Sequence, residues 1–200
     1  MEDITIASAT PEMAEVCSEL AILAAPELLP AVFGQDVQQF WNKAFRHRRC
    51  CFSYKHSICL QVNAETVGLA IMYSNVDKKK EGLRSLLIML RYLKWTFFRK
   101  LSALKQAGEI MAQIQENDHY LSNLAILPRH RSLGYGAKLM ESIEESAKKA
   151  GSRRMVLDAE THKDKTVQFY QRLGYDIEAR TPMLRTRDGD FECYRMFKYL

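Results

Sequence analysis

The sequence lacks three features that would point its function elsewhere. No apolar run reaches the eighteen or so uncharged residues that a membrane-spanning helix needs. The opening MEDITIA has no basic segment followed by an apolar one, so we expect no signal peptide. The net charge of +5 over 200 residues is too small to indicate a nucleic-acid-binding protein, although it suits an anionic small-molecule ligand.

Cysteine is sparse and irregularly spaced. Five cysteines, an odd number without tight spacing, indicate free thiols and a cytoplasmic protein. His47, Cys50, Cys51, His56 and Cys59 lie close together in the sequence, but they form no CxxC pair, and adjacent cysteines reach one ion poorly. We therefore expect no metal site.

Regular hydrophobic patterning predicts one mixed α/β domain spanning residues 1–200. Apolar residues make up 47% of the chain and charged residues 26%, which is typical of a globular protein. Alternating and helical spacings set the elements, and no stretch has the composition of a linker. The predicted strands span 4–9, 57–62, 66–73, 119–126, 154–158, 175–179 and 191–197. The predicted helices span 11–24, 36–45, 81–115, 134–150 and 165–173, with a solvated loop at 78–80.

A glycine-bearing loop joins a predicted strand to a predicted helix. The strand ends in Leu124-Ala125-Ile126, and Arg131-x-x-Gly134-x-Gly136 opens the helix. A helix start leaves backbone N–H groups unpaired, and glycines let the backbone approach a pyrophosphate closely. Arginine adds a planar cation suited to phosphate oxygens. The loop therefore predicts a phosphate site, although it has neither the GK[ST] ending of a Walker A loop nor the third glycine of a dinucleotide fingerprint.

Two elements together resemble the GCN5-related N-acetyltransferase (GNAT) family. Arg131-x-x-Gly134-x-Gly136 resembles the R/Q-x-x-G-x-G/A signature of that family, and a strand-to-proline run precedes it as in the family. The segment 169–175, FYQRLGY, resembles the later F/L-Y-x-x-x-G-F/Y element. One helix and one strand separate the two elements, which is also the family spacing.

The resemblance implies a fold and an activity. The expected fold is a mostly antiparallel central sheet with one splayed strand, helices on both faces and a long helical insert at 81–115. The expected enzyme transfers the acetyl group of acetyl-CoA directly to an amine, which is a small molecule or the N-terminus or a lysine of a protein. Whether the chain forms a homodimer is left open.

The resemblance also assigns site residues. In the family, the strand matching 123–126 splays from its neighbour, so the backbone of Leu124, Ala125 and Ile126 would serve the pantetheine arm, with the Leu124 N–H polarising the thioester carbonyl. Tyr170 matches the tyrosine that protonates the departing CoA thiolate. The pyrophosphate would be held by Arg131 and by the amides of Ser132, Leu133, Gly134, Tyr135, Gly136 and Ala137.

The chain departs from the family pattern at three positions. Lys163 and Thr166 stand where the family often has asparagine and alanine, which leaves cofactor contacts on that helix open. Asn123 stands nearest to the place where a glutamate often acts as general base. We assign no base; the candidates are Asp158, Glu160, His119 and a water chain.

The insert and the activity each have alternatives. Leucines recur at helical spacing through 81–115, with basic residues among them and Gly108 as the weak point. We favour a helix pair packed on the sheet with a solvated basic face, over a lid on the acceptor site or a basic amphipathic surface for a membrane or partner. The alternatives to an enzyme are a CoA-binding sensor without turnover and an adapter that docks a membrane or partner through the insert.

Overall fold

A computed structural model describes residues 3–200, apart from the side chain of Ala112. Within this range, seven strands form one sheet that is antiparallel except between β4 and β5. In spatial order the strands are β1 (Ile4–Ser8), β2 (Ser57–Val62), β3 (Glu65–Ser74), β4 (Asp118–Ile126), β5 (Arg154–Glu160), β9 (Cys193–Tyr199) and β6 (Asp176–Arg180). A separate hairpin pairs β7 (Leu184–Thr186) with β8 (Gly189–Phe191).

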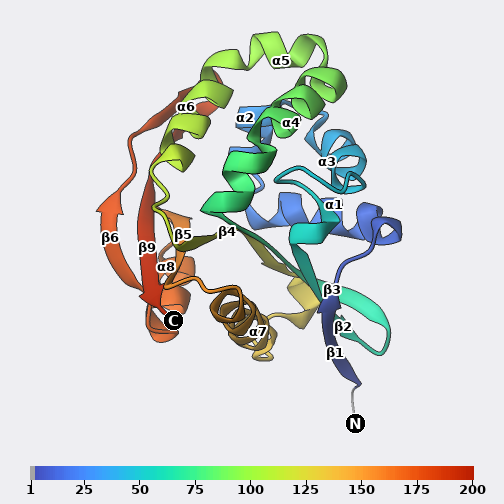
Figure 1. The fold of residues 1–200 in the computed structure, drawn as a ribbon, viewed down its shortest axis with the longest axis vertical. Helices are drawn as coiled ribbons and strands as arrows, with labels where there is room; N and C mark the ends of the chain where they lie inside the picture. The colour runs from blue at the N-terminus through green and yellow to red at the C-terminus, as the bar shows by residue number, and fades with distance from the viewer. Residues whose placement is uncertain (1–2) are drawn as a thin grey trace.

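Helices cover both faces of the sheet (Figure 1). On one face lie α7 (Tyr135–Lys149) and α8 (Asp164–Arg172). On the other face are α1 (Ala14–Ala24), α2 (Leu28–Phe33), α3 (Val37–Phe45) and three further helices, α4 (Asn75–Leu93), α5 (Trp95–Arg99) and α6 (Leu101–Ala112). Single 3₁₀ turns are η1 (Pro11–Met13), η2 (Tyr54–His56) and η3 (Pro128–His130).

Each face of the sheet has its own apolar core. Leu139 and Ile143 of α7 are fully buried against Met72 and Leu157 of the sheet. Strand side chains alternate between faces, so Ile71, the neighbour of Met72, packs instead among α1 and α3. The two cores confirm the predicted mixed α/β fold with helices on both faces.

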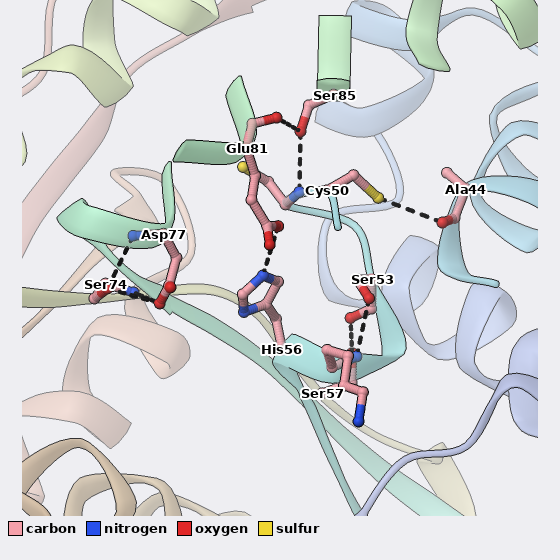
Figure 2. A network of polar contacts seen from close by, with 11 residues as sticks. Ala44, Cys50, Ser53, His56, Ser57, Ser74, Asp77, Glu81 and Ser85 are labelled. Atoms are coloured by element: carbon pink, nitrogen blue, oxygen red, sulfur yellow. Dashed lines mark hydrogen bonds and ion pairs between the residues drawn. The ribbon is translucent and has the colours of Figure 1, made fainter. Parts of the chain in front are cut away.

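The insert differs from its prediction at its start and at its breaks. The predicted loop at 78–80 is helical, because Ser74 and Asp77 form a capping box that begins α4 at Asn75 (Figure 2). The helix breaks at Lys94, which has a φ of 49°, and again before α6, whereas Gly108 lies inside α6. The lysine-rich composition predicts a loop, whereas Ser74 and Asp77, whose side chains cap the helix start, are the local signal for a helix.

Helix α4 docks on the body of the protein through both apolar and polar contacts, with Ile88 and Leu93 buried in the core beside α1 and α3. Ser85 Oγ accepts a hydrogen bond from the Cys51 amide (3.0 Å) and donates one to the Glu81 carbonyl (3.0 Å). His56 Nε2 lies 2.9 Å from the Glu81 carboxylate (Figure 2).

Several leucines of α4 remain exposed. The predicted solvated basic face is present in α4, since Lys80, Arg84 and Arg91 are exposed. The prediction that the apolar face packs is wrong for four of the five leucines of α4, and Leu93 alone among them is buried.

Candidate active site

The two parallel strands at the centre of the sheet diverge. Pairing between β4 and β5 joins Asp118–Leu121 to Arg154–Leu157 and then stops, although both strands continue. On the other edge of β4, the register against β3 shifts between Ile71 and Met72, which leaves Ser122 as an extra residue. Such a bulge bends and twists a strand. It explains why β4 leaves β5 directly after Leu121.

The divergence exposes backbone groups of β4. Leu127 donates its N–H to the Val67 carbonyl of β3 (2.8 Å). Successive amides of a strand point to opposite edges, so the N–H groups of Leu124 and Ile126 point toward β5, where no ladder continues. The geometry thus offers the two amides that the resemblance assigned to the pantetheine arm.

The loop after β4 forms an anion cradle at the start of α7. Gly134 is the N-cap and lies in the left-handed region with a φ of 79°, and Ser132 has a φ of 63°. Within the described residues, no backbone or side-chain acceptor takes a hydrogen bond from the amides of Ser132, Leu133, Gly134, Gly136 and Ala137. A helix N-terminus with free amides fits a pyrophosphate group.

Two neighbours shape this cradle. Arg131 is exposed, and its Nε donates to the Ile126 carbonyl (3.0 Å), which anchors the guanidinium group at the end of β4. Gly136 lies against Phe169 of α8, since a Cβ atom there would come within 3.2 Å of the ring. Glycine at this position therefore lets α8 approach the helix start. Tyr135 is buried in the core and contributes only its backbone to the edge of the cradle.

Tyr170 lies in the core that joins α7, α8 and the sheet. Its ring packs against Phe169 at 5.2 Å and Tyr175 at 5.7 Å, and only 7% of the residue is exposed. Burial raises the pKa of the Tyr170 phenol, because the phenolate loses hydration. The phenol is therefore protonated at neutral pH, as a proton donor must be.

The three side chains considered as general base differ in their hydrogen-bond partners. Asp158 accepts two hydrogen bonds from Arg195, both of 2.9 Å, and one from the Tyr120 hydroxyl at 3.1 Å. His119 lies where β4 and β5 are still paired, with its Nδ1 3.1 Å from the Ser152 hydroxyl. Burial lowers the pKa of His119. Asp158 and His119 are thus both held by hydrogen bonds within the protein scaffold.

Glu160 differs from these two because it lies at the diverging end of β5. The residue is 6% exposed, and one carboxylate oxygen contacts Lys163. The other oxygen, Oε2, is buried and has no hydrogen-bond partner within the described chain. His162 Nε2 lies 3.7 Å from this oxygen. One oxygen of the Glu160 carboxylate is thus paired with Lys163, and the other accepts no hydrogen bond from the described residues.

A cavity of about 460 Å³ opens at His162, two residues after Glu160. The segment after α1, the segment after β5 and the β7–β8 turn line it, through residues that include Pro26, Pro30, Gln35, His162, Asp188 and Asp190. The sequence did not predict this cavity, because no local signal indicates that β7 and β8 pair and fold against α2 and α6. The cavity has room for a small amine or a peptide end.

The cysteine- and histidine-rich segment forms no converging ligand set. Within residues 3–200, no group of three or more histidine, cysteine or carboxylate side chains is placed to hold a metal ion. Cys59 Sγ instead lies 3.5 Å from Cys17 Sγ. Burial raises the pKa of Cys50 to about 12, which keeps this thiol protonated at neutral pH.

Known structures share this fold across nearly the whole chain. The ribosomal-protein-S18-alanine N-acetyltransferase of Escherichia coli is 15% identical with a TM-score of 0.60, covering 98% of this chain and 94% of its own. An agmatine N-acetyltransferase is 12% identical with a TM-score of 0.65, covering 99% and 100%. The PaiA N-acetyltransferase of Thermoplasma acidophilum, in complex with coenzyme A, is 14% identical with a TM-score of 0.56, covering 99% of each chain. At these identities the likeness establishes the fold.

Sequence comparison supplies the family. No curated protein matches the sequence. The model of the acetyltransferase (GNAT) family matches residues 26–175, three quarters of the chain, including the diverging strand, the anion cradle and Tyr170. The chain therefore belongs to the acetyltransferase (GNAT) family of enzymes, which use acetyl-CoA.

Proposed function

We propose that this enzyme transfers the acetyl group of acetyl-CoA to a primary amine bound in the cavity beside the end of β5. The observation that carries the proposal is the divergence of β4 from β5 after Leu121, which leaves the Leu124 and Ile126 amides open beside the anion cradle. Acetyl-CoA supplies an activated acyl group as a thioester. The amine class is supported by neighbours of the same fold that are named for agmatine and for a protein alanine.

The residues of the chain divide the work between binding and proton transfer. The amides of Ser132 to Ala137, with Arg131, hold the pyrophosphate, and Leu124 and Ile126 orient the pantetheine arm. The Leu124 N–H stabilises negative charge on the thioester oxygen, where a donor in a dry site is worth several kcal/mol. As the C–S bond breaks, Tyr170 donates its proton to sulfur.

Glu160 is the general base of the proposal. An amine attacks only as the neutral base. Its nitrogen must then lose one more proton as the new C–N bond forms. Glu160 Oε2 has no hydrogen-bond partner within the described chain, whereas Arg195 and Tyr120 occupy Asp158. The amine proton passes to Glu160 through His162, which lines the cavity and whose Nε2 lies 3.7 Å from that oxygen.

The test is acyl transfer against a panel of amines. Purified protein with acetyl-CoA should release free thiol only when an acceptor is present, and mass spectrometry should find the acetylated amine. Small diamines, amino acids and peptides with free N-termini make up the panel. Binding of acetyl-CoA without thiol release for any amine would favour the alternative of a CoA-binding sensor.

A further inference from the structure

An exposed apolar surface runs along the insert. We call it the apolar ridge, and its members are at least 41% exposed, with Leu83 at 70% and Trp95 at 74%. So many large exposed apolar side chains on one insert are unusual on a monomeric soluble protein and mark a contact with another phase or molecule. Its members are Leu83, Leu86, Leu87, Leu90, Trp95, Phe98 and Leu101.

The ridge is at the outer edge of the fold. Helix α4 faces the protein with Ser85, Ile88 and Leu93, and its other four leucines are exposed. Trp95 and Phe98 belong to α5, which caps the molecule at the end away from the N-terminus (Figure 1). No neighbouring element within residues 3–200 covers these side chains.

A basic groove adjoins the ridge. This groove, of about 770 Å³, lies between the segment after α3 and helix α4. Arg84 and Leu87 line it from α4, so the groove and the ridge share an edge. Its lining also includes His47, Arg48, Arg49, Lys55, Glu81 and Ile88.

The positive charge of the groove is not balanced by the protein itself. The one acidic side chain in its lining, Glu81, already lies 2.9 Å from His56 (Figure 2). Within the described chain, no carboxylate forms an ion pair with Arg48, Arg49 or Arg84. An anionic group from outside would therefore meet several unpaired cations.

We propose that the apolar ridge and the basic groove together form a docking surface for an anionic lipid bilayer. The ridge lies in the boundary between headgroups and acyl chains, where tryptophan and leucine are favoured, and the groove receives lipid phosphates. No helix within residues 3–200 is long and apolar enough to cross a membrane. The insert therefore lies on the surface of the bilayer.

Charge argues against a second copy of the chain as the occupant. Arg84 and Arg91 are two helical turns apart on one exposed flank of the ridge, and Lys80 continues that flank. Two ridges packed on each other would bring these flanks together, and like charges repel. An anionic bilayer offers an apolar region to the side chains of the ridge and negative headgroups to its basic flank.

Vesicle binding tests the proposal without acetyl-CoA. The full chain is mixed with vesicles of phosphatidylcholine alone, or with one third phosphatidylglycerol, and sedimented. We expect binding to the anionic vesicles only, with a blue shift of tryptophan emission. The Trp95→Phe variant should still bind but lose the shift, because the other tryptophan, Trp41, is buried in the core.

Matched variants separate the two parts of the surface. Combined Arg48→Gln, Arg49→Gln and Arg84→Gln should weaken binding about 100-fold, since each charge near an anionic surface contributes about fivefold. Removing three exposed charges from the opposite face, with Lys148→Gln, Lys165→Gln and Arg172→Gln, should change binding by less than about threefold. Combined Leu83→Ser and Leu87→Ser should weaken it at least about tenfold.

Three results would overturn the proposal. They are no binding to anionic vesicles, equal binding to neutral ones, and equal losses in the two charge triples. If vesicles fail and the chain sediments as a dimer that Leu83→Ser with Leu87→Ser dissociates, the ridge is a self-association surface. Circular dichroism of each variant confirms that it is folded.

Discussion

A tyrosine phenol is protonated at neutral pH even when exposed, and burial raises the pKa of Tyr170 further. The same low-dielectric surroundings that raise the pKa of the phenol also raise that of a thiol placed beside it, because both anions lose hydration. The two groups therefore remain matched for proton transfer as the thiolate forms. A tyrosine on the surface would match a buried thiol less well.

We expect Tyr170→Phe to lower kcat by roughly ten- to a thousandfold, the range for loss of a general acid. The affinity for acetyl-CoA should barely change, because the hydroxyl acts as charge develops on sulfur. Steady-state kinetics and calorimetric binding measure the two quantities.

Tyr175→Phe is the matched control, since it removes a second phenol from the same core. Its hydroxyl donates to Glu144 (2.9 Å), so this variant should lose about 1.5–3 kcal/mol of stability and keep its turnover per folded molecule. A wild-type rate in folded Tyr170→Phe would leave proton delivery to water or to the acceptor.

Glu160→Gln tests the proposed base. The amide keeps the shape of the side chain but cannot take the amine proton, so kcat/KM should fall roughly a hundredfold, within the usual range for a general base. The same amines, compared at an alkaline pH where they are already neutral, should recover part of the rate. Unchanged kcat/KM at neutral pH would exclude Glu160.

Asp158→Asn should behave in the opposite way. It leaves Arg195, which is 5% exposed, without its partner, and breaking a buried pair costs about 3–5 kcal/mol. We expect a lower melting temperature and a near-normal rate for the folded fraction. Thermal melts beside kinetics distinguish this framework role from that of Glu160.

At the scale of elements, the two ends of α7 offer a controlled experiment. Gly134 before the helix and Gly151 after it have φ values of 79° and 83°, and each has open space where a Cβ atom would lie. Alanine should cost each about 1–2 kcal/mol of stability, because L residues are strained there. The two substitutions differ in that Gly134 is part of the anion cradle and Gly151 is not.

We therefore expect Gly134→Ala, and not Gly151→Ala, to weaken acetyl-CoA binding by at least about tenfold, because the free amides at the N-terminus hold phosphate. Isothermal titration calorimetry measures both dissociation constants. Equal affinities would mean that the phosphates bind elsewhere. Gly136→Val is a less clean test, since its Cβ atom would also press on Phe169.

At the scale of the whole molecule, acetyl-CoA should stabilise the fold. A ligand that binds only the native state at 100 times its Kd adds about 2.7 kcal/mol, which for a chain of this size raises Tm by about 5–10 °C. Thermal melts with acetyl-CoA and with acetate at equal concentration check this expectation. No shift at millimolar acetyl-CoA would remove the basis of the proposed function.

The sequence by itself determined the order of the seven strands of the main sheet and of most helices, the glycine-bearing start of α7 and the family. These features depend on local signals: hydrophobic periodicity, helix stop signals such as Gly151, and the fixed spacing of Arg131, Gly134 and Gly136. The cytoplasmic location and the oligomeric state remain predictions.

Only the tertiary structure decided what depends on distant segments meeting. The sequence listed Asp158 and Glu160 as equal candidates; the approach of Arg195 from β9 separates them. Periodicity assigned the leucines of α4 to a packed face, but Ser85 and Glu81 meet Cys51 and His56. The helix therefore docks with Leu93 inward and its other four leucines exposed. Hydrophobic spacing shows that a helix has an apolar face, whereas the partner of that face depends on which surfaces the rest of the chain has already filled.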